Sequence, residues 1–198
     1  MQLELETYMP NEAEEITGVT QATVRNWRRA GYLDRPKGHA RYTIADLLVM
    51  FATRLMVERG VAVKAATPFA REAARAIFQT VIYRKDAYAP ALLGDKAADD
   101  LQRLEALFAL GDRTAQQFGL AGIKRPDWLI IWADDNIEFL YDSDADGETA
   151  DAQFFGNIKY SEEYVQGPVM MLCLPALAHM ICKRLPRPAI KCSTEATA

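Results

Sequence analysis

Apolar residues near the start of the chain recur at helical spacing, and capping residues mark where two short helices begin and end. Asn11 predicts the N-cap of a first helix, because three of the next four residues are acidic and suit the positive end of a helix. Gly18 predicts its end, since glycine takes a left-handed C-cap at no cost. Thr20 predicts the cap of a second helix over residues 21–30, closed by Gly31. This order predicts a helix-turn-helix.

The second helix has an apolar side and a basic side. Val24 and Trp27 lie three positions apart, so we expect both to face the first helix. The opposite side suits a DNA groove, where early residues of a recognition helix meet base edges and later arginines hold phosphates. Arg25 can grip a guanine edge through two hydrogen bonds or hold a phosphate. The DNA contacts predicted here come from Thr20, Gln21, Thr23, Arg25, Arg28 and Arg29.

A short basic loop follows, from Tyr32 to Tyr42, with Gly38 at its tip. A glycine-tipped loop between hydrophobic residues predicts a small β-hairpin, or wing. Its predicted DNA contacts are Lys37, His39, Arg41 and Tyr42. Thr43 then predicts the cap of a third helix over residues 44–59, and a fourth helix is predicted over residues 64–84.

Charge is unevenly distributed along the chain. Residues 1–86 carry 13 Lys+Arg and 10 Asp+Glu, while the remaining residues carry 10 Lys+Arg and 17 Asp+Glu. The net charge of −4 is therefore the sum of a basic N-terminal part and an acidic C-terminal part. This asymmetry indicates a nucleic-acid partner at one end. The alternative is a helical hairpin with a solvated arginine face. It explains the arginines but not the ordered caps, the glycine turn and the basic loop.

The same segment resembles the winged helix-turn-helix head of the MerR family over roughly residues 8–80. The matching motifs are Glu15-Ile-Thr-Gly-Val-Thr20, Val24-Arg25, Arg29-Ala-Gly-Tyr-Leu33, Arg41-Tyr42-Thr43, Asp46-Leu47 and Glu58-Arg-Gly-Val61. The resemblance implies a homodimer that binds a two-fold symmetric operator and regulates transcription. It also implies that Thr23 and Arg25 are recognition-helix contacts and that Arg41 and Tyr42 are wing contacts to phosphate.

The chain departs from the family pattern at two points. Asn26 precedes Trp27, where the family usually has an aromatic pair after the recognition arginine, and the wing is short. Phage excisionases and small phage DNA-packaging proteins share this looser form. An architectural or packaging DNA-binding protein of phage or mobile-element origin is therefore the alternative to a transcription regulator.

The rest of the chain predicts a small α+β domain over residues 87–188, for dimerisation or effector binding, after a DNA-binding domain over residues 1–86. Its elements are a dimer helix over 95–110 (barely two heptads), a β-hairpin over 128–141, a third strand over 154–160, an apolar run over 169–174 and a helix from Pro175 to about 185. Residues 189–198 are predicted to be a flexible tail. The predicted fold class is mainly α with a small α+β C-terminal part.

The other candidate sites for chemistry each lack a feature that the chemistry needs. Residues 142–148 resemble the opening of a calcium loop, but the twelfth position is Gln153, which cannot supply a bidentate carboxylate. Cys173, Cys182 and Cys192 lack ligand-like spacing, and neither His39 nor His179 has a catalytic partner in the pattern. We therefore expect no metal, no cofactor and no enzyme activity.

Neither a secretory signal nor a membrane span, which needs roughly 20 apolar residues, is expected from the pattern. The predicted protein is cytoplasmic and nucleoid-associated, of bacterial or phage origin, and acts as a homodimer on double-stranded DNA. A third hypothesis is a ligand-sensing domain tethered to DNA, since the C-terminal half is rich in aromatic residues that can line a pocket for a small-molecule effector. Core packing is the default explanation for those aromatics.

Overall fold

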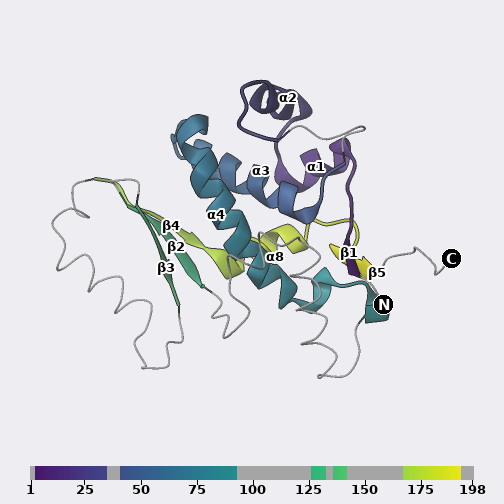
Figure 1. Ribbon diagram of the computed structural model, residues 1–198. Helices are drawn as coiled ribbons and strands as arrows, with labels where there is room; N and C mark the ends of the chain where they lie inside the picture. The colour runs from purple at the N-terminus through teal and green to yellow at the C-terminus, as the bar shows by residue number, and fades with distance from the viewer. Residues whose placement is uncertain (1–2, 35–40, 93–125, 133–135, 142–166, 193–198) are drawn as a thin grey trace.

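The computed structural model describes residues 3–34, 41–92, 126–132, 136–141 and 167–192. Within these ranges the fold is mainly helical with two small antiparallel sheets, which confirms the predicted fold class (Figure 1). Several predicted features lie outside the described residues, namely the wing tip at 35–40, the dimer helix at 95–110, the acidic loop at 142–153 and the strand at 154–160.

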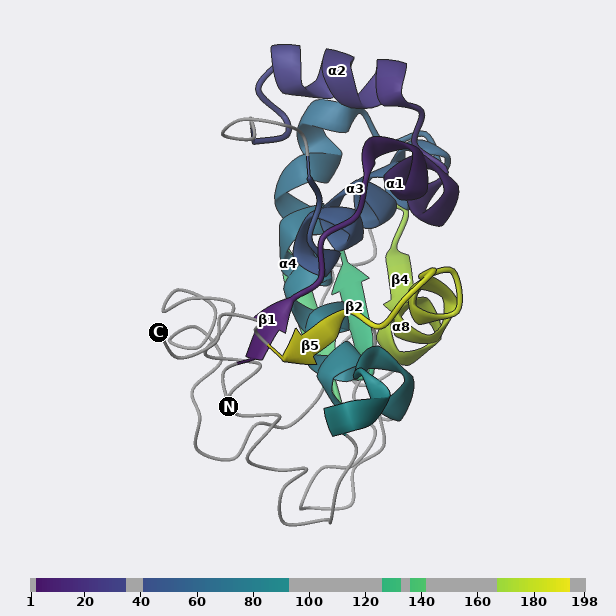
Figure 2. The same cartoon turned by 90° about the vertical axis from the view of Figure 1, so that its right-hand side faces the viewer.

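Four helices make up the N-terminal part of the described chain: α1 (Pro10–Thr17), α2 (Gln21–Arg29), α3 (Ile44–Val57) and α4 (Val63–Ile82). Thr20 caps α2 as predicted, because its hydroxyl oxygen accepts the Thr23 backbone N–H at 3.2 Å. Thr43 likewise accepts the Asp46 N–H at 3.4 Å and caps α3. In both views α2 lies at one end of the molecule, and α4 runs from near α2 to the opposite end (Figures 1 and 2).

The start of α1 differs from the prediction. Its N-cap is Met9 rather than Asn11, and Pro10 takes the first helical position. Proline suits this position because its φ is already helical and its missing N–H would have no partner there. The Glu12 carboxylate accepts the Met9 backbone N–H at 2.7 Å, which closes the first turn. At the other end Gly18 has φ 69°, as predicted for a left-handed C-cap.

Replacing Gly18 with alanine is expected to lower the free energy of unfolding by about 2–3 kcal/mol. A left-handed backbone costs an L-residue about 1–2 kcal/mol. A Cβ at this position would also displace the Arg54 guanidinium, whose Nη1 donates to the Thr17 carbonyl at 2.8 Å, and a hydrogen bond of this kind contributes about 1 kcal/mol. Urea unfolding followed by circular dichroism measures the change.

Gly31→Ala is the matched control for this substitution. Gly31 has φ 80° and open space where a Cβ would lie, so its replacement carries the backbone cost without touching Arg54. We expect Gly18→Ala to be the more destabilising of the two. Equal losses would show that the Arg54 contact adds nothing to the end of α1.

The three-stranded sheet contains the predicted hairpin and adds a strand to it. Strand β2 (Trp128–Ile131) pairs antiparallel with β3 (Ile137–Leu140) on one side and with β4 (Met170–Cys173) on the other. Helix α8 (Leu174–Cys182) follows β4 directly, with a proline in its first turn as predicted. Two short 3-10 turns, η1 (Lys85–Ala87) and η2 (Pro90–Leu92), follow α4.

A single hydrophobic cluster joins the early and late parts of the described chain. It includes buried side chains of α1 to α4, such as Phe51 and Ile77, together with Leu129 of β2 and Ile181 of α8. Figure 1 shows α8 lying against α4 at the centre of the fold. The division at residue 86 stays a prediction, and the described residues on its two sides share this cluster.

The predicted flexible tail is wrong for its first four residues. Strand β5 (Ile190–Cys192) pairs antiparallel with β1 (Leu3–Leu5), which places these two strands side by side (Figure 2). Ala189 and Ile190 are fully buried. Each strand has three residues, too few to show an alternating pattern in the sequence.

Candidate nucleic-acid interface

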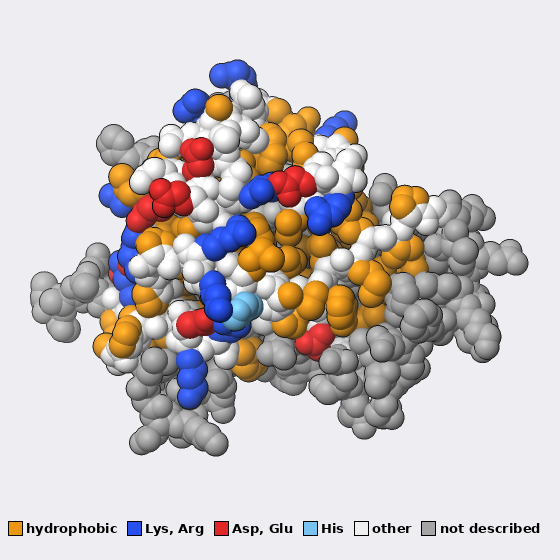
Figure 3. All heavy atoms as spheres, turned by 180° about the vertical axis from the view of Figure 1, so that it is seen from behind, with side chains coloured by type: hydrophobic (Ala, Val, Ile, Leu, Met, Phe, Trp, Pro, Cys, Tyr) orange, Lys and Arg blue, Asp and Glu red, His pale blue; other side chains and the backbone are white. Residues whose placement is uncertain are grey.

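Helix α2 presents its polar side to solvent at the end of the molecule. Val24 and Trp27 are only 5% and 8% exposed, since they face the core as predicted. On the other side Gln21, Arg25 and Arg29 are exposed. Figure 3 shows lysine and arginine side chains at this end of the molecule. The helix therefore offers an exposed polar face supported by a buried apolar one, which is the arrangement a groove-reading helix needs.

The first turn of α2 is held by side-chain hydrogen bonds. The Thr20 and Thr23 hydroxyl groups lie 2.9 Å apart and share a hydrogen bond. The Gln21 backbone N–H donates to Glu14 Oε2 at 3.3 Å, so α1 also supports this turn. These contacts fix the direction from which α2 leaves the turn, and so the direction in which Arg25 projects.

Arg28 and Tyr42 connect α2 to the end of the wing through a cation–π contact. Arg28 Nε donates to the Asp34 carbonyl at 3.2 Å, and its guanidinium lies 4.9 Å from the centre of the Tyr42 ring. Tyr42 is 4% exposed, and its backbone pairs with Tyr8 through hydrogen bonds of 2.8 and 3.0 Å. Their predicted DNA contacts stay predictions, and the geometry gives both residues a positioning role.

The wing is described only at its two ends. Arg41 is exposed, whereas Lys37 and His39 lie outside the described residues. Arg71 of α4 contacts the start of the wing, because its Nη2 lies 3.4 Å from Asp34 Oδ1. Sequence reasoning missed this contact, and no sequence signal links two residues that are 37 positions apart.

A second contact that the sequence did not predict joins the C-terminal segment to the head. We call Arg184 and Arg187 the clasp. Arg187 donates to both Glu12 carboxylate oxygens at 2.5 and 3.0 Å and to the Thr7 carbonyl at 2.6 Å. Arg184 Nη1 donates to the Ile16 carbonyl at 3.2 Å, near the end of α1. The clasp thus holds both ends of the first helix.

The clasp changes the acidity of Glu12. The hydrogen bonds from the Arg187 guanidinium, with a further one from the Met9 N–H, lower the pKa of the Glu12 carboxyl to about 2. Glu12 is therefore ionised in neutral and in mildly acidic solution. The pair with Arg187 stays charged over the same range.

Cys182 is a buried thiol that carries no ordinary thiolate chemistry at neutral pH. Burial raises the pKa of the Cys182 thiol to about 11, so this sulfur is protonated at neutral pH.

Among the residues that the structure describes, no three His, Cys, Asp or Glu side chains gather closely enough to hold a metal ion. In the same ranges, no helix is both long and apolar enough to cross a membrane.

The sequence of the helix-turn-helix segment matches a known protein family. Residues 8–72, about a third of the chain, match the family described as MerR HTH family regulatory protein. The match runs from the residue that pairs with the wing exit to the middle of α4. Residues 8–72 therefore match the helix-turn-helix of MerR-family regulators, which is a family of DNA-binding transcription regulators. A comparison with curated proteins found no match to the chain.

Proposed function

We propose that this protein is a homodimer that binds a specific, two-fold symmetric DNA site and regulates transcription from it. The observation that carries the proposal is the exposed polar face of α2, with Gln21, Arg25 and Arg29 at one end of the molecule. The buried Val24 and Trp27 hold that face rigidly against the core. The positions of the side chains suit entry of α2 into a major groove.

Dimerisation follows from how little DNA one such helix covers. A single recognition helix contacts only a few base pairs, so proteins of this kind read two half-sites about one helical turn apart. The segment proposed to join the two copies is the predicted helix at 95–110. A dimer would place one α2 in each of two successive major grooves.

The proposal is tested by selecting binding sites from a random duplex library with the purified full-length protein. We expect a recurring two-fold symmetric site and a complex with two chains, measured by native mass spectrometry. A footprint that spreads along DNA with no recurring motif would instead support the architectural or packaging alternative. A single chain on an asymmetric site would contradict the homodimer.

Arg41→Ala is expected to weaken binding to selected and random duplexes by the same factor. Arg41 is exposed at the wing exit, where we propose that it contacts a phosphate. Loss of one phosphate contact per subunit should make the slope of log affinity against log salt shallower by about one per subunit. Fluorescence anisotropy at several salt concentrations measures this slope.

Lys85→Ala is the control for this substitution. Lys85 is exposed on η1, which lies beyond the end of α4 far from α2 (Figure 1). Its replacement removes one positive charge, as Arg41→Ala does. Because Lys85 lies away from the proposed DNA contacts, the slope should stay at the wild-type value. If Arg41→Ala also keeps the wild-type slope, the wing exit does not contact phosphate.

A further inference from the structure

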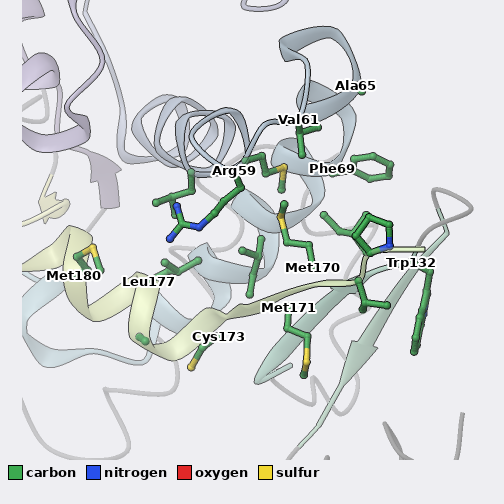
Figure 4. A pocket seen from close by; sticks show the side chains of 17 residues that line it. Arg59, Val61, Ala65, Phe69, Trp132, Met170, Met171, Cys173, Leu177 and Met180 are labelled. Atoms are coloured by element: carbon green, nitrogen blue, oxygen red, sulfur yellow. The ribbon is translucent and has the colours of Figure 1, made fainter. Parts of the chain in front are cut away.

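A cavity of about 690 Å³ lies where the helix-turn-helix head meets the C-terminal part of the described chain (Figure 4). Its walls come from the end of α3, the start of α4, strand β4 and helix α8. The size lies within the range of about 300–1,000 Å³ that is typical of small-molecule sites. The cavity is unrelated to the exposed face of α2, so the proposed DNA contacts do not use it.

The walls are apolar and easily deformed. They include the aromatic rings of Phe69 and Trp132 and the thioethers of Met56, Met170 and Met180. Methionine side chains adapt to ligands of different shape, because they are unbranched and polarisable. Figure 3 shows hydrophobic side chains gathered across this side of the molecule, and Met180 is 39% exposed. Such walls favour an apolar ligand body.

Arg59 is the one charged residue among the described residues that line the cavity. Figure 4 shows its side chain extending over the cavity toward Leu177. The neighbouring Glu58 does not neutralise it, because Glu58 Oε1 is paired with Arg54 Nε at 2.6 Å. Within the described ranges, Arg59 makes no ion pair of its own. The cavity therefore has a single positive charge at an otherwise apolar wall.

The turn after α3 fixes the position of Arg59. Gly60 has φ 91°, and the Val61 N–H returns to the Met56 carbonyl at 3.2 Å. The Arg59 N–H itself donates to the same carbonyl at 3.0 Å. These bonds close the end of the helix as left-handed glycine caps do. The backbone that carries the guanidinium is thus set before any ligand arrives.

We propose that this cavity binds an amphipathic monoanion, a small molecule with an apolar body and one carboxylate or sulfonate group. The apolar body would lie against the methionine and aromatic walls, and burial of apolar surface there is favourable. The anionic group would accept two hydrogen bonds from the Arg59 guanidinium. Binding does not require DNA, so the proposal goes beyond the proposed function and stands apart from it.

The experiment uses the full-length protein without DNA and the fluorescent probe 1-anilinonaphthalene-8-sulfonate. We expect saturable binding at one site per chain, with the protein still unfolding cooperatively. Decanoate and 1-decanol then compete for the probe, because they share an apolar chain of the same length and differ in charge. Decanoate is expected to displace the probe at about tenfold lower concentration, the size expected for a charge-assisted hydrogen bond.

Three variants make the test specific. Arg59→Ala should remove the difference between decanoate and decanol while leaving decanol unchanged. Ala65→Trp, at an exposed position on the cavity wall, should weaken both competitors by filling the space. Lys64→Ala removes a positive charge next to Ala65 but outside the lining, and it should behave as the wild type.

Three results would overturn the proposal. The first is a native protein that shows no saturable probe binding, as expected if another segment of the chain or a second copy occupies the cavity. The second is equal competition by decanoate and decanol in the wild type. The third is an Arg59→Ala protein that still distinguishes them. None of these results bears on whether α2 binds DNA.

Discussion

Arg25→Ala is expected to weaken binding to the selected DNA site by about ten- to a hundredfold and to change binding to random duplex much less. A bidentate contact between an arginine and a guanine edge contributes about 1–3 kcal/mol of discrimination against other bases. Arg25 projects from the exposed face of α2 and makes no hydrogen bond or ion pair with another described residue, so its loss should leave the fold intact. Anisotropy titrations of both duplexes at one fixed salt concentration measure the two affinities.

Arg29→Ala is the matched comparison for this experiment. Arg29 is exposed one helical turn later on the same face, where we expect a phosphate contact rather than a base contact. Its removal should lower both affinities by a similar factor. If Arg25→Ala also lowers both affinities equally, Arg25 holds a phosphate, and the reading of bases must be assigned to other residues such as Gln21 or Thr23.

Arg187→Met is expected to lower the free energy of unfolding by about 1–3 kcal/mol at pH 7, the range for hydrogen bonds to charged groups in a partly exposed pair. The substitution removes the hydrogen bonds to Glu12 and to the Thr7 carbonyl. It keeps an apolar stem over the Tyr8 ring, which lies 4.9 Å from the guanidinium carbon in the wild type. Urea unfolding midpoints of the two proteins measure the difference.

The ion pair between Glu12 and Arg187 should make the free energy of unfolding depend on pH, which apolar packing alone would not do. The folded pKa of Glu12 is about 2, below its ordinary value of 4.5 in the unfolded chain. Its contribution to stability is therefore fully present above about pH 4.5 and is lost as the pH falls toward 2. After Arg187→Met, stability should fall less over this window, and Glu12→Gln should give the same flattening. Parallel stability curves for wild type and variant would show that the pair is not what stabilises the head.

Short-range signals in the sequence predicted the helices that form the proposed reading head. Thr20 and Thr43 cap α2 and α3, and Gly18 adopts the left-handed backbone that was expected of it. Each of these features depends on residues within four positions of one another, which is why the sequence reveals them. Asn11 failed as a cap because Pro10, one position earlier, is itself suited to start a helix.

Long-range contacts were beyond the reach of such patterns. Arg187 and Glu12 are separated by 175 positions, and β1 and β5 have three residues each. No pattern in the residues near Arg187, or near either short strand, indicates which distant residues it contacts. The contact between Arg28 and Tyr42 was missed for a related reason, since helical spacing does not relate these two residues. The exposure of Arg25 and Arg29, by contrast, follows from helical spacing alone.

The clasp and strand β5 are synthesised after every helix of the head that they hold. When α1 and α2 leave the ribosome, Glu12 has no Arg187 to pair with, and Leu3 to Leu5 have no strand beside them. Contacts between such distant positions form slowly, because a long loop must close before they can form. We therefore expect the head to reach its final form only on chains that extend through strand β5, and a fragment ending at residue 86 to be a poor substitute for the protein in DNA-binding experiments.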